Sequence, residues 1–189
     1  AFGHGVSVTT LQLAAAYSVF ANQGIRKQPS LLKIEKPLSS EQVIDPAIVQ
    51  QILPMIEAVT LPGGTGTRAR VPFFRVGGKT GTVYKLGPGG YSADRYIAMF
   101  AGLAPLSNPR YVLAVMIDEP KSGKYYGGEV AAPVFSQLMQ GVLQLMGAVP
   151  DDLPIINPAQ EKEVQKSAEG VKNNVPFERL ASTTGGRAA

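Results

Sequence analysis

A lysine and two threonines stand among three glycines in the segment RVGGKTGTVYK, residues 75–85. A lysine ammonium and hydroxyl donors are groups that bind an anion. Gly78, Lys79 and Thr80 match the end of the phosphate-binding pattern G-x-x-x-x-G-K-[ST], but the glycine that this pattern needs at position 73 is Phe73. The bulky run 73–76 is expected to be an extended strand rather than a loop that curls around phosphates. A nucleotide site is therefore not favoured.

A strand would divide the polar residues of this segment between its two sides. Thr80 and Thr82 would point to one side, and Lys79 and Gly81 to the other. Gly81 adds no bulk where the backbone of a ligand approaches. If the strand has an exposed edge, it can bind an extended peptide as an added strand.

Composition limits the other kinds of site. The chain has 189 residues, 44% hydrophobic and 17% charged, which is ordinary for one globular domain with a core. It has no cysteine and one histidine, His4, so a metal centre is not expected. The net charge of +4 is scattered, which favours solubility or an anionic substrate over nucleic acid. Its apolar runs are too short to span a membrane, and the chain is expected to stay in water or to be a piece of a longer protein.

Two helices are predicted before this segment. Thr9 and Gln12 have the spacing of a capping box, and Gly24 can end the helix that they begin. A second helix is predicted from Asp45 to about Val59, because Asp-Pro is a common helix start.

Three antiparallel strands are predicted next. Runs rich in β-branched and aromatic residues cover 73–83, 95–105 and 110–118, and turn residues separate them. A last helix is predicted over 131–147, with Pro133 in its first turn, and it should cover one face of the sheet. Its buried stripe is predicted to be Val134, Leu138, Val142 and Leu145. The fold class is therefore α+β, an antiparallel sheet covered by helices.

The chain changes character near residue 150. Residues 1–150 hold all the predicted elements, whereas residues 151–189 are polar and poor in core-forming side chains. The second part is therefore predicted to be a disordered or loosely attached tail.

The Lys79-Thr80-Gly81 element on an antiparallel strand is similar to the K-T-G motif of penicillin-binding proteins and serine β-lactamases. Residues 1 to about 150 resemble the class B penicillin-binding proteins, most closely the division-specific members. The segments that carry this resemblance are GHGVSVTTLQLAAAYSVFANQG, LPGGTGTRARV, GGKTGTVYKLGPGGYSADRYIAMFAGLAP, NPRYVLAVMID and KYYGGEVAAPVF.

That resemblance implies a fold, an activity and a location. Members of the family have a five-stranded antiparallel sheet covered by helices, in a periplasmic domain that is anchored to the inner membrane. They are D,D-transpeptidases that cross-link peptidoglycan stem peptides ending in D-Ala-D-Ala, at the septum in the division-specific members. The reaction proceeds through an acyl-enzyme on a serine. β-lactam antibiotics acylate and so block that serine, and no cofactor is used. Other divisome proteins are expected partners.

The resemblance also implies roles for single residues. The hydroxyls of Thr80 and Thr82 would bind the terminal carboxylate of the substrate or of a β-lactam. Lys79 would add positive charge, and the backbone N–H of Thr82 would be half of the oxyanion hole, beside Gly81.

Tyr125, Tyr126 and Gly127 would form a wall of the substrate cleft. Turn residues with aromatic packing remain the alternative for these three positions. His4 is expected to be structural or exposed to solvent, and Glu129 and Asp118-Glu119 to be solvated charges.

Two motifs of the family are not recognised here. Its chain order is S-x-x-K, S-x-N, K-T-G, and the S-x-x-K match, Ser30 to Lys33, follows Pro29 in a connecting segment rather than opening a helix. Ser92 to Asp94 follows Lys79 and is interpreted as turn chemistry. The chain is therefore expected to be the C-terminal half of a transpeptidase domain, inactive alone, with apolar strand residues of YIAMF and YVLAVMI exposed.

Two alternatives to the transpeptidase stay open. A D,D-carboxypeptidase or β-lactamase-like hydrolase shares the K-T-G motif, but it must admit a hydrolytic water. A non-enzymatic sensor domain would be acylated by β-lactams without turnover. The segments LPGGTGTRARV and KYYGG favour the transferase.

Overall fold

The computed structural model describes residues 6–35, 38–87, 89–121 and 123–153. The chain divides into two units, Ala1–Leu153 and Pro154–Ala189, and every described residue belongs to the first. His4 and residues 154–189 of the predicted tail lie outside the described residues.

Both predicted N-terminal helices are present. Helix α1 spans Thr10–Ala21, and its capping box is complete, because Gln12 N donates to Thr9 Oγ1 (3.1 Å) and Thr9 N donates to Gln12 Oε1 (2.8 Å). Helix α2 spans Pro46–Ala58 and is capped by Asp45.

A small antiparallel ribbon between these helices has no counterpart in the sequence-based prediction. It pairs β1 (Ile25–Lys27) with β2 (Ser40–Gln42). Ser30 lies in the exposed connection between the two strands, as predicted, and its Oγ donates to Leu32 O (2.8 Å).

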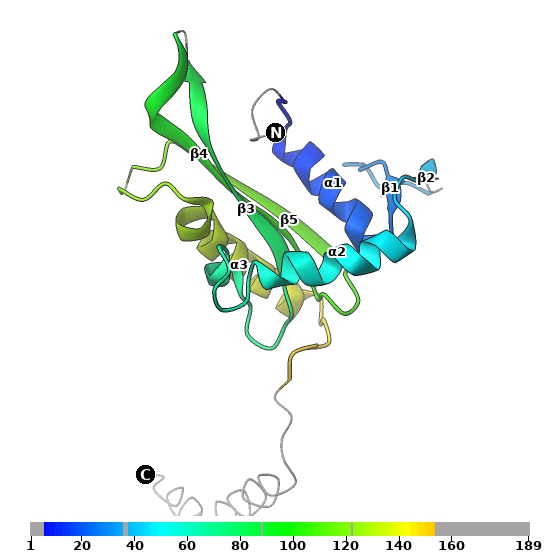
Figure 1. Ribbon diagram of the computed structural model, residues 1–189. Helices are drawn as coiled ribbons and strands as arrows, with labels where there is room; N and C mark the ends of the chain where they lie inside the picture. The colour runs from blue at the N-terminus through cyan, green and yellow to red at the C-terminus, as the bar shows by residue number, and fades with distance from the viewer. Residues whose placement is uncertain (1–5, 36–37, 88, 122, 154–189) are drawn as a thin grey trace, which may run out of the picture. The chain divides into compact units, whose positions relative to one another are not determined.

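The main sheet has three antiparallel strands in the order β3-β4-β5 (Figure 1). They are β3 (Gly77–Gly87), β4 (Gly90–Ala104) and β5 (Tyr111–Asp118). Strand β3 pairs only with β4 within the described residues, so the K-T-G segment lies on an edge strand.

The strand boundaries differ from the prediction at two places. Phe73 has a φ of 67° and lies in a turn closed by the Val71–Phe74 bridge, so the predicted strand over 73–76 is wrong. At the other end, pairing continues to Gly87 opposite Gly90. Ser92 to Asp94 therefore belongs to strand β4 rather than to a turn. These residues lie between the pairs Tyr84–Tyr96 and Leu86–Tyr91, where the register of the two strands shifts.

Helix α3 (Gly127–Leu145) covers one face of the sheet (Figure 1), but its buried stripe is not the predicted one. The ring of Phe135 is fully buried and packs against Phe100 with 4.7 Å between ring centroids. The buried side chains on this helix are Ala131, Ala132, Phe135, Met139 and Leu143, whereas Val134, Leu138, Val142 and Leu145 are exposed. Both sets follow helical spacing, so periodicity alone does not choose between them.

The start of helix α3 also differs from the prediction, since Pro133 lies inside the helix and not in its first turn. Proline has no N–H to donate to the carbonyl one turn earlier, which here belongs to Glu129. Arg68 Nη1 lies 3.5 Å from that carbonyl oxygen and partly replaces the missing donor.

Helix α1 packs against β4 and β5 on the side of the sheet opposite α3 (Figure 1). The prediction that the apolar residues of YIAMF and YVLAVMI are exposed is therefore wrong for the chain as described. Within these two runs only Met116 is exposed, at 48%.

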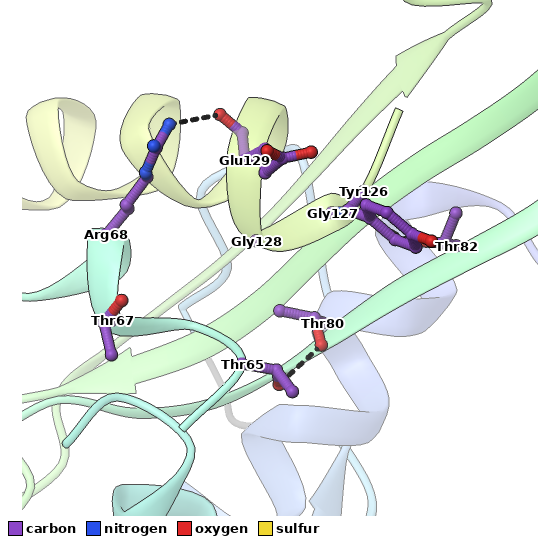
Figure 2. A pocket seen from close by; sticks show the side chains of 9 residues that line it. All are labelled: Thr65, Thr67, Arg68, Thr80, Thr82, Tyr126, Gly127, Gly128 and Glu129. Carbon is purple, nitrogen blue, oxygen red and sulfur yellow. Dashed lines mark hydrogen bonds between the residues drawn. The ribbon is translucent and has the colours of Figure 1, made fainter. Parts of the chain in front are cut away.

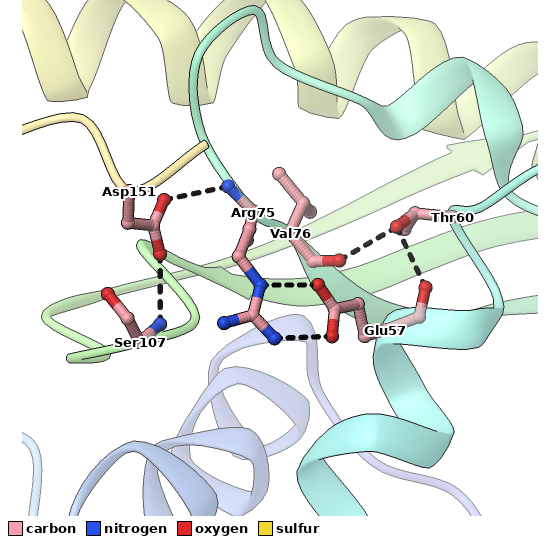
Figure 3. Close-up of polar contacts among 6 residues, drawn as sticks. All are labelled: Glu57, Thr60, Arg75, Val76, Ser107 and Asp151. Atoms are coloured by element: carbon pink, nitrogen blue, oxygen red, sulfur yellow. Dashed lines mark hydrogen bonds and ion pairs between the residues drawn. The ribbon is translucent and has the colours of Figure 1, made fainter. Parts of the chain in front are cut away.

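A polar cluster fixes the chain just before β3 (Figure 3). The Arg75 guanidinium forms two 2.7 Å hydrogen bonds to the carboxylate of Glu57 on α2. The buried hydroxyl of Thr60 lies 2.8 Å from Val76 O. The carboxylate of Asp151 accepts from Arg75 N (2.7 Å) and Ser107 N (2.9 Å). The predicted division at residue 150 stays a prediction, and Asp151 itself belongs to the first unit.

Candidate active site

Strand β3 presents its threonines to a cleft of about 380 Å³ at the N-terminus of α3 (Figure 2). Thr80 and Thr82 both line it, because alternate residues of a strand share one face. The lining residues are Thr65, Thr67, Arg68, Thr80, Thr82, Tyr126, Gly127, Gly128 and Glu129.

Lys79 is exposed beside this cleft and bends back toward the next residue. Its Nζ donates to Thr80 O (3.0 Å) and lies 3.4 Å from Thr80 Oγ1. Gly81 is partly buried, and a Cβ at this position would lie 3.2 Å from the terminal methyl of Met99. Strand β3 is extended here, so its glycines do not form the curled loop of a phosphate site.

The wall opposite the threonines is the first turn of α3. Gly127 N donates to Thr82 Oγ1 (3.0 Å). A Cβ on Gly127 would lie 2.2 Å from Met99 O, and one on Gly128 would lie 2.0 Å from Thr65 O. The two glycines therefore let the helix end approach β3, β4 and the preceding loop closely.

Four tyrosine rings lie in a row that ends at Tyr126, and the middle pair, Tyr96 and Tyr125, is stacked. The ring centroids of Tyr84 and Tyr96 are 4.9 Å apart, those of Tyr96 and Tyr125 are 4.1 Å apart, and those of Tyr125 and Tyr126 are 4.5 Å apart. Tyr126 lines the cleft, whereas Tyr125 lies between two rings of the row. The hydrogen bond with the Tyr126 hydroxyl raises the pKa of Tyr125 to about 12.

Three residues that line the cleft were not predicted from the sequence: Thr65, Thr67 and Arg68. Thr65 precedes the 3-10 helix η1 (Thr67–Ala69), and the other two belong to it. Thr65 Oγ1 lies 2.9 Å from Thr80 Oγ1. The glycines of the segment LPGGTGTRARV could have indicated that this loop packs closely against the rest of the chain. A Cβ on Gly64 would lie only 2.2 Å from Val59 O.

The acidic residues near the site have neighbours that the prediction did not name. Glu129 lines the cleft. Asp118 and Glu119 form ion pairs with Lys85 at 2.6 and 2.9 Å, and their side chains remain 51% and 34% exposed. Among the described residues, no group of three or more histidine, cysteine or acidic side chains could hold a metal ion.

Comparison with known proteins gives one consistent family. Residues 1–140 match the penicillin binding protein transpeptidase domain. Peptidoglycan D,D-transpeptidase FtsI of Escherichia coli strain K12 is 46% identical over 152 residues, which are 80% of this chain and 26% of that protein. The probable peptidoglycan D,D-transpeptidase PbpC of Pseudomonas aeruginosa is 43% identical over 80% of this chain and 27% of its own length.

A solved structure has the same fold. The transpeptidase domain of Burkholderia pseudomallei penicillin-binding protein 3 is 40% identical and superposes with a TM-score of 0.73. The match covers 80% of this chain and 46% of that domain. The chain thus spans about a quarter of these curated relatives and less than half of the solved domain.

Proposed function

The chain belongs to the penicillin-binding protein transpeptidase family, and on this premise we propose that the protein that carries it is a peptidoglycan D,D-transpeptidase. It cross-links stem peptides that end in D-Ala-D-Ala through a serine acyl-enzyme, and β-lactams inhibit it by occupying the same site. The nucleophilic serine and the S-x-N motif are proposed to lie in a part of the protein outside these 189 residues.

The observation that carries this proposal is the pair of threonine hydroxyls on an edge strand. Thr82 Oγ1 accepts the N–H of Gly127, so its own proton is free to donate to a ligand. Thr80 Oγ1 faces the same cleft and has the Lys79 ammonium 3.4 Å away. Two hydroxyl donors beside a positive charge suit an anionic group that only accepts, such as a terminal carboxylate.

The edge position of β3 supports the remaining roles. The stem peptide is proposed to bind beside β3 as an added strand along Gly81. Tyr126 and Gly127 form the proposed wall, and Tyr125 packs against Tyr126. Lys79 directs positive charge toward the carboxylate and the serine of S-x-N. The backbone N–H of Thr82 supplies one oxyanion donor.

The proposed location and partners rest on the resemblance to the division-specific members of the family. Several of the relatives are named FtsI, so we place the activity in septal wall synthesis, with other divisome proteins as partners. The site would face the periplasm from the inner membrane. No helix among the described residues is long and apolar enough to cross a membrane.

The test is an acyl-transfer assay with the full-length protein, a donor stem peptide and an acceptor amine. Formation of the cross-linked product supports a transpeptidase. Hydrolysis of the donor without transfer would favour a carboxypeptidase or β-lactamase-like enzyme. Acylation by penicillin with neither product would indicate a sensor domain.

A further inference from the structure

Thr65 reaches the threonines of β3 from a different part of the chain. It lies in the loop between α2 and η1, and its Oγ1 is 2.9 Å from Thr80 Oγ1 (Figure 2). Backbone packing sets the position of this loop. The carbonyl of Thr65 lies against Gly128, and Gly66 N donates to Val59 O (2.8 Å). The hydroxyl contact is therefore a result of the loop position and does not hold the loop alone.

The direction of this hydrogen bond decides what Thr80 offers a ligand. A hydroxyl has one proton to donate and two lone pairs that accept. If Thr80 donates to Thr65, it presents only lone pairs to the cleft, and these repel a carboxylate. If Thr65 donates to Thr80, the Thr80 proton is free for the ligand.

The surroundings of Thr80 are compatible with the second direction, and a ligand that only accepts requires it. Lys79 Nζ can only donate, and it lies 3.4 Å from Thr80 Oγ1. With Lys79 and Thr65 both directed at its lone pairs, Thr80 has the same arrangement as Thr82, whose oxygen accepts from Gly127 N. Both hydroxyl protons are then available to one ligand.

We infer that Thr65 is a positioning residue that donates to Thr80 and so directs the Thr80 proton to the carboxylate of the substrate or β-lactam. This inference rests on the proposed function, because it requires a carboxylate at Thr80. It predicts that Thr65 contributes to selection of a charged acceptor over an uncharged one of similar shape, since a charged acceptor gains more from a correctly directed donor.

The experiment uses the full-length protein and measures the second-order rate constant of acylation by benzylpenicillin and by its methyl ester. Thr65→Val keeps the shape of the side chain and removes the hydroxyl. We expect it to lower the rate with the acid roughly five- to tenfold and to change the rate with the ester less than about twofold. Thr65→Ser keeps the hydroxyl and should retain the wild-type preference. Ser30→Ala removes an exposed hydroxyl on the β1–β2 connection and is the matched control.

The outcomes separate this inference from the proposed function. If Thr65→Val lowers the rates with acid and ester equally, Thr65 only supports the shape of the cleft and the inference is wrong. A wild-type preference for the acid would still support the carboxylate site. If wild type shows no preference for the acid, or no acylation at all, the carboxylate site at Thr80 fails and the inference fails with it.

Discussion

The hydroxyl of Thr80, which is proposed to bind the ligand, depends on contacts that the short motif around it does not contain. The pattern Lys79-Thr80-Gly81 gives the residue types and one neighbour of the hydroxyl, Lys79, but the second neighbour comes from another part of the chain. Thr65 is 15 positions away in the sequence, on a loop, and reaches Thr80 only after α2 and β3 are placed. Residue spacing therefore predicts Thr80 as a donor but does not predict its partner.

Replacing Thr80 by valine in the full-length protein should weaken acylation by a penicillin. The change removes one hydroxyl proposed to bind a carboxylate, which corresponds to about 1.5 to 3 kcal/mol for a hydrogen bond to a charged group. The second-order acylation rate constant measures the effect, and an unchanged melting temperature excludes unfolding as its cause. A valine variant that is acylated at the wild-type rate would contradict the role given to Thr80.

Tyr125 should stay protonated to unusually high pH. Its ordinary pKa of 10.0 is raised to about 12, chiefly by the hydrogen bond with Tyr126. Because the folded-state pKa is the higher one, the stability that this phenol contributes is complete below about pH 10 and is lost as the pH rises through about 12. The ultraviolet absorbance of tyrosinate is recorded against pH for the wild type and for Tyr125→Phe, and the difference between the two curves reports the titration of this phenol. A difference curve centred near pH 10 would show that the bond to Tyr126 does not form in solution.

For helix α3, the sequence predicts the presence of the helix but not the side that is buried. The presence of the helix and its apolar character follow from residue spacing. The buried side of the helix does not follow from spacing, because Val134 and Phe135 belong to two apolar stripes that are one residue apart. The contact between Phe135 and Phe100 selects the stripe, and that contact joins elements far apart in the sequence. Strand β3 shows the same limit, since only pairing with β4 extends it through residues with turn preferences.

The orientation of α3 can be tested by a matched pair of substitutions. Phe135→Ala should lower the free energy of unfolding by about 3 to 5 kcal/mol, because it empties a fully buried site. Leu138→Ala should cost clearly less, since half of that side chain is already exposed. Denaturant unfolding of both variants makes the comparison, and equal losses would favour the stripe predicted from sequence.

The segment around Asp151 connects the end of the first unit to the start of β3. Asp151→Ala should lower the free energy of unfolding by about 1.5 to 3 kcal/mol, because its carboxylate accepts from two backbone N–H groups. Asp152→Ala keeps the backbone bond from Asp152 N to Phe73 O and is the control.

Truncations give an independent check of the same contact. In the full-length protein, removal of residues 154–189 keeps Asp151 and should leave β-lactam binding unchanged, whereas removal from residue 151 onward should weaken both stability and binding. Equal behaviour of the two truncated proteins would show that Asp151 does not hold β3.

At the scale of the whole molecule, the chain contains one part of the proposed site. The described residues supply three of the five strands that the family resemblance implies. They also supply the two threonines proposed to bind a carboxylate and the wall of the cleft, while no S-x-N motif precedes Lys79 in the sequence. Catalytic groups of this kind act as a unit, so loss of the nucleophile removes nearly all the chemistry.

Residues 1–189 alone are therefore expected to form no covalent adduct with penicillin. Mass spectrometry of the intact chain after incubation with a labelled penicillin measures this, and the full-length protein is the positive control. An adduct on Ser30 would contradict both the proposed place of the nucleophile and the interpretation of Ser30 as a loop residue.

Strand β3 is fixed at both of its ends, while its outer edge pairs with no other strand in the part of the chain that the structure describes. The polar cluster of Glu57, Thr60, Arg75 and Asp151 holds one end (Figure 3), and the row of tyrosine rings begins at Tyr84 near the other. The loss of conformational entropy that comes with ordering this strand therefore occurs when the protein folds and not when a ligand binds. A peptide that pairs with the open edge then needs to order little beyond itself, so stiffening the peptide should strengthen binding more than any further stiffening of β3.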